Sequence, residues 1–437
     1  MVGPAAARVN GWTAGPGWGR VAPPRMMGRA MTVGVGGSDA ATELAAIVNE
    51  REAVPPIPVE EHERRIAAAR ALMEERQVEA LWLDGSTNLA YFTGVSHGQS
   101  ERMVGAILPK RGEITWICPE FEAERIRAML KIPGPVRGWE EDESPYALFV
   151  EVLRELQIGS GTIAIDDHAR FFIADEIRSA GGEDYRFVRS AAIASHLRSR
   201  KSEHELALIR QAMRMTVKIH AAAARILHEG IATTEVQSFI DTAHRKAGFD
   251  GGCPFNIVLF GAASAYPHGV PYAQTLKPGD VVLIDCGAAL HGYRSDITRS
   301  YVFGEPTERQ RFLWNTVKAS QAAGFAAARP GVACGALDDA ARAVIVAAGF
   351  GPGYKVPGLP HRVGHGVGMD GHEEPYFVKG NAQPLEVGMC GSIEPTLAVY
   401  GECGIRLEDH IHVTETGAAW FTTPCASVDD PFDLDRG

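Results

Sequence analysis

The chain has 437 residues, which is long for one domain and comfortable for two. Hydrophobic residues make up 45% of it and charged residues 22%, which is ordinary for a soluble globular protein. The formal net charge of −11 argues against nucleic acid or an anionic membrane as the main partner.

The first 38 residues are rich in glycine, proline and alanine, and they contain four arginines and no acidic residue. They lack the compact apolar core of a secretory signal. No stretch of the whole chain approaches the roughly 20 consecutive apolar residues that a membrane helix needs. A transit peptide, disorder and a true translation start at Met31 all remain open for this segment. We expect residues 1–56 to form a flexible tail.

An α/β domain is predicted over residues 57–195. Residues 60–77 have the apolar periodicity of an amphipathic helix. Short apolar runs with helical stretches between them predict strands at 80–83, 104–108, 114–118 and 162–165. This region has no glycine-rich phosphate loop and no cluster of acidic residues or histidines, so it can have a purely structural role.

A second domain, of α+β type, is predicted over residues 200–428. Ser202 and Glu205 form a capping-box pattern in front of apolar residues at helical spacing. Further helices are predicted to start at Thr234 (with Gln237) and at Thr307 (with Gln310), and another to span 336–348. Strand candidates alternate with these helices.

Five side chains in the second domain have the chemistry and the setting of metal ligands. A carboxylate that ends an apolar strand is rarely buried unless it is paired or binds a metal. Four carboxylates and one imidazole suit manganese, cobalt, zinc or iron(II) better than copper. Because four negative charges exceed what one divalent ion needs, we predict two metal ions. The candidate ligands are Asp285, Asp296, His365, Glu394 and Glu408.

The local sequence predicts how two of these ligands meet. Residues 281–284 form an apolar run that Asp285 closes, and 295–302 reads as a second strand after a glycine-rich reversal. Two antiparallel neighbours would bring Asp285 and Asp296 together. A two-metal site lowers the pKa of a bound water and stabilises an oxyanion, so the chain is predicted to be a hydrolase.

The seven cysteines are scattered and include no Cys-x-x-Cys pair. This distribution favours reduced thiols in a cytoplasmic protein over a disulfide framework. Cys286 follows a candidate ligand, but the ligand set is complete without sulfur, so we expect Cys286 to be a packing residue.

Histidines near the predicted ligands are candidates for contacts to substrate. His365 lies between glycines, which allow close approach of the backbone, and His372 follows seven residues later. His361 opens the same segment, and His268 lies in a loop upstream. A lone histidine is more often a surface or core residue, and the glycine-rich setting argues against that interpretation most clearly for His365 and His372.

The segments that hold these residues resemble the pita-bread metallopeptidases, which include prolidase, aminopeptidase P, methionine aminopeptidase and creatinase. The resemblance covers residues 57–428 and is greatest to bacterial Xaa-Pro dipeptidases (prolidases), notably over 357–366. It implies a homodimer, with a creatinase-like N-terminal α/β domain followed by an α+β pita-bread catalytic domain. The matching segments are 284–287, 295–299, 364–366, 372–373, 393–395 and 406–409.

The resemblance also implies a role for each ligand. Asp285 holds one metal and His365 the other, while Asp296 and Glu408 bridge both. Glu394 binds a metal and accepts a proton from the bridging water. The water thereby becomes the metal-bridging hydroxide that attacks the substrate. Manganese is the expected metal, with cobalt, zinc or iron(II) as alternatives.

The resemblance places other side chains against an Xaa-Pro dipeptide. His268 and His372 donate hydrogen bonds to the scissile carbonyl oxygen, and His361 lies on the proline side. Arg406 precedes Glu408 by two residues, so both can share one face of a strand. Arg406 either captures the free carboxylate of the substrate or only neutralises the anionic site.

Three alternative functions follow from the same pattern. An aminopeptidase of the aminopeptidase P type, acting on longer Xaa-Pro peptides, has a nearly identical site. A non-peptide amidohydrolase such as creatinase and a non-catalytic binding protein are disfavoured, because such relatives lack metal ligands that this chain retains.

Overall fold

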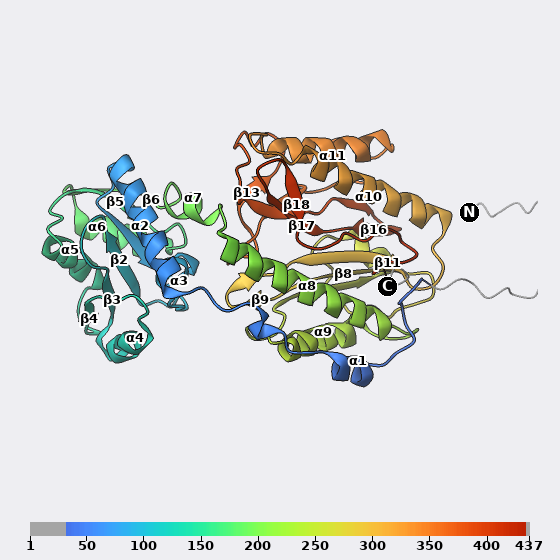
Figure 1. Cartoon of the computed structure of the whole chain (residues 1–437), viewed down its shortest axis with the longest axis horizontal. Helices are drawn as coiled ribbons and strands as arrows, with labels where there is room; N and C mark the ends of the chain where they lie inside the picture. Colours follow the sequence, from blue (N-terminus) through green and yellow to red (C-terminus); the bar gives the residue numbers. More distant parts are fainter. Residues whose placement is uncertain (1–31, 434–437) are drawn as a thin grey trace, which may run out of the picture.

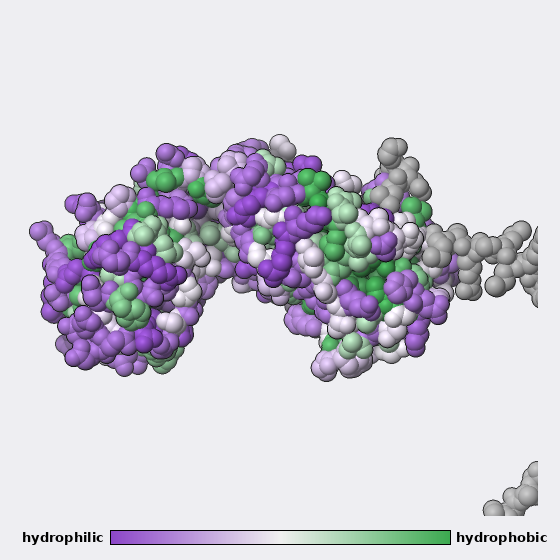
Figure 2. All heavy atoms as spheres, turned by 90° about the horizontal axis from the view of Figure 1, so that it is seen from below, coloured by the Kyte–Doolittle hydropathy of each residue, from purple (hydrophilic) through white to green (hydrophobic). Residues whose placement is uncertain are grey.

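The computed structural model describes residues 32–433, which form two domains (Figure 1). Figure 2 shows them as two lobes joined at a narrower waist, with mostly hydrophilic side chains on the visible face of the smaller lobe. Among residues 32–433, no helix is both long and apolar enough to cross a membrane.

The smaller domain is a mixed sheet with helices on both faces. Its strands run in the order β4-β3-β2-β1-β5-β6, and the central β1 pairs antiparallel with β2 and parallel with β5. Each face carries its own apolar core. The strands are β1 (Ala80–Asp84), β2 (Gly105–Pro109), β3 (Thr115–Pro119), β4 (Val136–Trp139), β5 (Gly161–Ile165) and β6 (Tyr185–Arg189).

The one helix that the apolar periodicity predicts in this domain is present. The helix predicted at 60–77 is α2 (Val59–Arg76), and it buries Ile66, Ala69 and Met73. The four predicted strands correspond to β1, β2, β3 and β5 to within about a residue at each end. The remaining helices are α3 (Thr87–Thr93), η2 (Glu120–Glu122), α4 (Ala123–Met129), α5 (Pro145–Glu155), α6 (Phe171–Gly181) and α7 (Ala194–Arg198).

Buried ion pairs connect the two domains. Arg65 on α2 donates to the hydroxyl of Tyr293 at 2.9 Å and lies 3.4 Å from Glu205 at the start of α8 (Glu203–Arg225). Arg198 on α7 pairs with Asp370 at 2.6 Å. The predicted capping box forms at the start of α8, where Ser202 and Glu205 bond reciprocally.

The larger domain places its sheets between two pairs of helices (Figure 1). One sheet has the order β11-β8-β7, and α8 packs beside α9 (Thr233–Ala247) over its apolar face. A second sheet has the order β13-β12-β14-β17-β18, against which α10 (Glu308–Ala327) and α11 (Gly335–Ala347) pack. The strands and the short helix of the larger domain are β7 (Phe255–Phe260), η3 (Gly261–Ala265), β8 (Val281–Gly287), β9 (Ala289–Leu290), β10 (Tyr293–Arg294), β11 (Ile297–Val302), β12 (Gly364–Gly366), β13 (Glu373–Phe377), β14 (Cys390–Ile393), β15 (Thr396–Val399), β16 (Cys403–Arg406), β17 (Asp409–Val413) and β18 (Ala418–Trp420).

The expectation of a flexible tail through residue 56 is wrong for its second half. Residues 32–56 include α1 (Ala40–Ala46) and η1 (Arg51–Ala53). Thr32 donates to the carbonyl of Val302 at 2.9 Å, Val35 is buried in the core below α8 and α9, and Glu43 pairs with Arg225 at 2.7 Å. These contacts are tertiary, so they leave no periodic signal in the sequence. The predictions for the basic segment before Met31 concern residues outside those that the structure describes.

One helix start also differs from the sequence prediction. The N-cap of α9 is Ala232, and the Glu235 carboxylate accepts from its backbone N–H at 2.9 Å, so the Thr234–Gln237 pair is not the cap. An alanine cap lacks the side-chain oxygen on which the sequence pattern depends. The Thr307–Gln310 box at the start of α10 forms as predicted.

Candidate active site

One cavity of about 770 Å³ in the larger domain collects all the side chains that the sequence singled out. Its wall includes the five candidate ligands, together with the three further histidines and Arg406. Side chains that the sequence analysis did not name, among them Tyr266, Tyr354 and Arg362, also line it. Residues from positions 255 to 408 therefore meet at a single place.

Three carboxylates form the deepest part of this cavity. Asp285 lies on β8 and pairs in register with Thr298 of β11, Asp296 directly precedes β11, and Glu408 bridges to Thr298. Their ligand atoms lie within 4.8 Å of one another. The antiparallel pairing expected for Asp285 and Asp296 thus brings them together, although β11 begins only at Ile297.

The three carboxylates fit a cation, because each leaves an oxygen without a partner. Asp285 Oδ1, Asp296 Oδ1 and Glu408 Oε1 are buried and accept no hydrogen bond. A buried carboxylate oxygen without a donor is costly unless it is protonated or binds a metal. Hard oxygen donors of this kind suit a divalent ion such as manganese.

A second possible position for a metal shares Glu408. His365 on β12 lies with its Nε2 3.1 Å from Glu394 Oε1 and 3.9 Å from Asp296 Oδ2. His365, Glu394 and Glu408 again present atoms within 4.8 Å of one another. His365 Nδ1 lies 3.1 Å from the carbonyl oxygen of Gly366, so Nδ1 carries a proton, and a metal could take the place of the Nε2 proton that faces Glu394. The donor set therefore fits two neighbouring ions.

Burial and mutual repulsion control the charges of the metal-free site. Burial raises the pKa of Asp285, Asp296 and Glu408, and neighbouring carboxylates add to the effect. Burial would also raise the pKa of Glu394, but the hydrogen bond and charge of His365 hold it well below its ordinary value. A bound cation would therefore be needed to keep Asp285, Asp296 and Glu408 ionised together.

Several side chains that the sequence analysis did not name hold the ligands in place. The Thr298 hydroxyl donates to Glu408 Oε2 at 2.7 Å, and Arg299 donates to the Glu408 carbonyl at 2.8 Å and to Asp409 at 2.7 Å. His410 is fully buried, and neither of its ring nitrogens has a hydrogen-bond partner. Its nitrogen lies within 4.8 Å of the nearest atoms of Asp296 and His365. Thr298 follows the predicted ligand Asp296 by two residues, and His410 follows Glu408 by two. This spacing could have indicated Thr298 and His410 from the sequence.

Arg406 is engaged inside the site. Its side chain is buried, and its guanidinium forms an ion pair with Asp285, donates to Thr298 Oγ1 at 3.1 Å and donates to the carbonyl of Pro267 at 3.0 Å. These contacts match the charge-neutralising interpretation of Arg406. All three guanidinium nitrogens already have a partner.

The outer histidines differ in their capacity to donate. The His372 ring lies 3.7 Å from that of His365 between centroids, and its Nδ1 lies 3.2 Å from Arg362 Nη2. Its Nδ1 is therefore the acceptor, and its Nε2–H is available as a donor. Reduced hydration and the neighbouring His365 lower the pKa of His372 to about 4, so the ring is neutral at neutral pH.

Both ring nitrogens of His361 have a hydrogen-bond partner, whereas the His268 side chain is more exposed. His361 Nδ1 lies 2.6 Å from the carbonyl of Arg362, and its Nε2 lies 2.8 Å from Thr396 Oγ1. Burial lowers its pKa. His268 lies on the loop before Gly269 and lines the cavity opposite. Only the faces of the His361 ring remain for contact with a substrate.

Family models match both parts of the chain. Residues 65–200 match the model described as Creatinase/Prolidase N-terminal domain, and residues 207–415 match Metallopeptidase family M24. The second match contains all five candidate ligands.

Related proteins match this chain over nearly their whole length. The chain is 33% identical over 362 residues to "Putative dipeptidase YkvY" of Bacillus subtilis, which covers 82% of this chain and 97% of the relative. Dipeptidase PepE from Mycobacterium ulcerans has a TM-score of 0.77 at 30% identity and covers 84% of this chain and 97% of that chain. Recombinant prolidase from Thermococcus sibiricus has a TM-score of 0.74 at 29% identity and covers 83% and 97%. Other prolidases, an Xaa-Pro dipeptidase and an X-Pro aminopeptidase share the fold.

Proposed function

Because this chain belongs to metallopeptidase family M24, we propose that it is a dipeptidase that uses two divalent metal ions to hydrolyse Xaa-Pro dipeptides. The observation that carries the proposal is the convergence of four buried ligands and the half-buried Glu394 in one cavity with three histidines around it. Dipeptidases and prolidases among the similar proteins support the substrate class.

The two trios of ligands would hold the ions, with Glu408 common to both. Asp285, Asp296 and Glu408 form one trio, and His365, Glu394 and Glu408 form the other. When bound, two divalent ions acidify a water and polarise the scissile carbonyl. We expect manganese, while cobalt, zinc and iron(II) also suit these donors.

The proton and the carbonyl oxygen are handled by the chain's own side chains. Glu394 Oε1 lies 3.1 Å from His365 Nε2 within one ligand trio, so its carboxylate would be placed to accept the proton of the attacking water. His372 Nε2–H and His268 face the cavity and would donate to the carbonyl oxygen as it becomes negative. His361 would present its ring to the proline side.

His372→Ala is expected to lower kcat by roughly 100-fold or more while leaving metal content unchanged, because a lost oxyanion donor typically costs about 3 kcal/mol. Metal analysis alongside steady-state kinetics on an Xaa-Pro dipeptide would measure this. A variant with normal kcat would remove His372 from the catalytic role.

Substrate length decides between the dipeptidase and its alternative. An aminopeptidase for longer Xaa-Pro peptides is favoured by one observation, that the guanidinium of Arg406 is already engaged by Asp285, Thr298 and Pro267. If Arg406 nevertheless captures the substrate carboxylate, free Xaa-Pro dipeptides should react roughly 30- to 150-fold better than amidated ones, which corresponds to ~2–3 kcal/mol.

Arg406→Met and Arg362→Ala form a matched pair for this test, since both arginines line the cavity. A carboxylate clamp at Arg406 predicts that only Arg406→Met erases the preference for the free dipeptide, chiefly through KM. A purely charge-neutralising Arg406 predicts that its loss slows free and amidated substrates equally and weakens metal binding. Equal rates on both substrates by the unmodified chain would favour the aminopeptidase.

A homodimer in the cytoplasm completes the proposal. The dimer follows from the family resemblance, and the cytoplasmic location is supported by seven cysteines that are all free and buried. Light scattering of the purified chain would test the dimer.

A further inference from the structure

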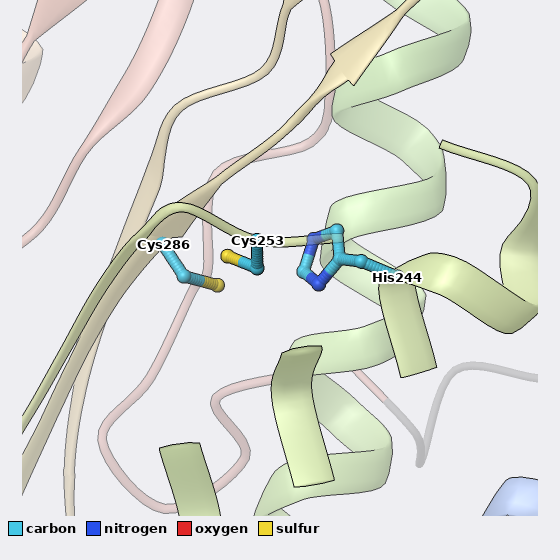
Figure 3. A group of neighbouring side chains, drawn as sticks. All are labelled: His244, Cys253 and Cys286. Carbon is cyan, nitrogen blue, oxygen red and sulfur yellow. The ribbon is translucent and has the colours of Figure 1, made fainter. Parts of the chain in front are cut away.

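A second cluster of metal-binding side chains lies on the other side of β8. The Nε2 or Nδ1 of His244 and the sulfurs of Cys253 and Cys286 lie within 4.8 Å of one another, and all three side chains are buried. Successive residues of a strand face opposite ways, so Asp285 faces the cavity while Cys286 faces α8 and α9. In Figure 3 the two sulfurs point toward each other, with the imidazole on the other side of Cys253.

The imidazole is oriented as a metal ligand would be. His244 Nδ1 lies 2.8 Å from the carbonyl oxygen of Ile240 on the same helix, so Nδ1 carries the proton. The lone pair of Nε2 has one long contact, 3.3 Å from Thr216 Oγ1. Metal-binding histidines commonly donate their other N–H to a backbone carbonyl in this way.

The two thiols come from different elements that the fold brings together. Cys286 lies on β8, whereas Cys253 follows Gly251 and Gly252, whose φ values of 116° and 96° turn the chain back after α9. The Cys253 thiol donates to the carbonyl of Phe255 at 3.0 Å, and no disulfide joins it to Cys286. Only glycine adopts both of those φ values readily, so the turn presents Cys253 to the cluster.

A histidine outside the trio also contacts Cys286. His220 Nε2 lies 3.0 Å from the carbonyl of Ile297, so this nitrogen carries a proton, and it also lies 3.3 Å from Cys286 Sγ. Packing alone would not require two thiols and an imidazole nitrogen with a single long contact at one point.

We propose that His244, Cys253 and Cys286 bind one thiophilic divalent ion of the zinc class, separate from the acidic site. On binding, the two thiols release two protons to solvent, and two thiolates and a neutral imidazole coordinate the ion. The resulting unit has no net charge, which suits an apolar core. Thiolate and imidazole donors prefer zinc, whereas the carboxylates across the strand prefer harder ions.

The geometry requires only a small contraction. Ligand atoms of a tetrahedral zinc site lie roughly 3.5–3.8 Å apart, given bonds of ~2.0–2.3 Å, and the three side chains would occupy three of its four positions. The present limit of 4.8 Å is about 1 Å wider. The ion would join α9 and the 251–253 turn to β8, the strand that carries Asp285, so we expect it to stabilise the fold rather than take part in the reaction.

Cobalt titration of the reduced full chain tests the site after the acidic cluster has been saturated with manganese. Thiolate ligation gives a sulfur-to-cobalt charge-transfer band in the near ultraviolet, which oxygen and imidazole ligands do not produce. We expect this band to saturate at about one equivalent per chain, as one tetrahedral site requires. Cys253→Ala should abolish it while peptidase activity with manganese persists.

Cys334→Ala is the matched control, because Cys334 is equally buried but lies outside the cluster, before α11. It should leave the band unchanged. Should Cys253→Ala fail to fold, X-ray absorption at the zinc edge of the unmodified chain serves instead, and sulfur in the zinc shell is expected. The proposal is overturned by the absence of the band in the reduced parent chain, by a band that survives Cys253→Ala, or by a zinc shell without sulfur.

Discussion

Glu408→Ala is expected to abolish peptidase activity and metal binding at both positions while the chain stays folded. Glu408 is the only carboxylate common to the two ligand trios of the described site, so its loss removes a donor from each. Its Oε1 has no hydrogen-bond partner and its Oε2 only that of Thr298, so few other contacts depend on it. Asp296→Ala should behave in the same way if Asp296 bridges.

Thermal unfolding separates this effect from misfolding. Metal should raise the stability of the parent chain by roughly 2.7 kcal/mol at concentrations ~100-fold above Kd, and it should not stabilise Glu408→Ala. Glu402→Ala is the control, since Glu402 is a surface carboxylate paired with Arg309. Two ions retained per chain in Glu408→Ala would show that the ligand assignment is wrong.

The metal-free forms should also differ in how stability depends on pH. Burial and the neighbouring carboxylates raise the pKa of Glu408 well above its ordinary value of 4.5. The folded chain then holds a proton that the unfolded chain releases, so stability is lost as pH rises from about the ordinary value toward the raised one. Glu408→Ala lacks that loss, and its stability relative to the parent should increase with pH over this window.

The sequence indicated which side chains gather in the cavity better than it indicated what surrounds them. The family resemblance and the order of a creatinase-like domain and a pita-bread domain are confirmed by the matched family models and structures. Asp285 and Asp296 could be placed together because an apolar strand, a glycine-rich reversal and a second strand are local features. All five ligands were singled out by their residue types and their setting in the sequence, whereas the assignment of each ligand to one or both metals came from the resemblance.

Features that depend on tertiary contacts were missed. Residues 32–56 pack through single contacts such as that of Thr32 with Val302, which no periodicity reveals. Arg299 supports Glu408 and Asp409 from within an apolar strand, where the sequence suggests only a basic residue among apolar ones. Cys286 was interpreted as a packing residue because the acidic ligand set is complete without sulfur, and its neighbours Cys253 and His244 lie far away in sequence.

Glu394→Gln is expected to reduce turnover by about two to four orders of magnitude while most of the metal stays bound, because a glutamine amide oxygen can still coordinate but cannot accept a proton. In the present structure Glu394 touches His365 at 3.1 Å and the Ser392 hydroxyl at 3.3 Å, and glutamine has the volume to keep both contacts. The loss should appear in kcat with little change in KM, since the proton moves only on the way to the transition state.

Two comparisons make the result specific to proton transfer. Glu386→Gln changes a surface glutamate that pairs with Arg200 outside the cavity, and it should leave kcat unaltered. Glu394→Ala with added formate should recover part of the lost rate if the missing function is that of a proton acceptor, because a small carboxylate can enter the space that the side chain vacates. Near-normal turnover of Glu394→Gln at saturating metal would exclude Glu394 as the base. Another group would then have to take the proton. His410 would be the next residue to substitute, because it is buried beside Asp296 and His365 and neither of its ring nitrogens has a hydrogen-bond partner.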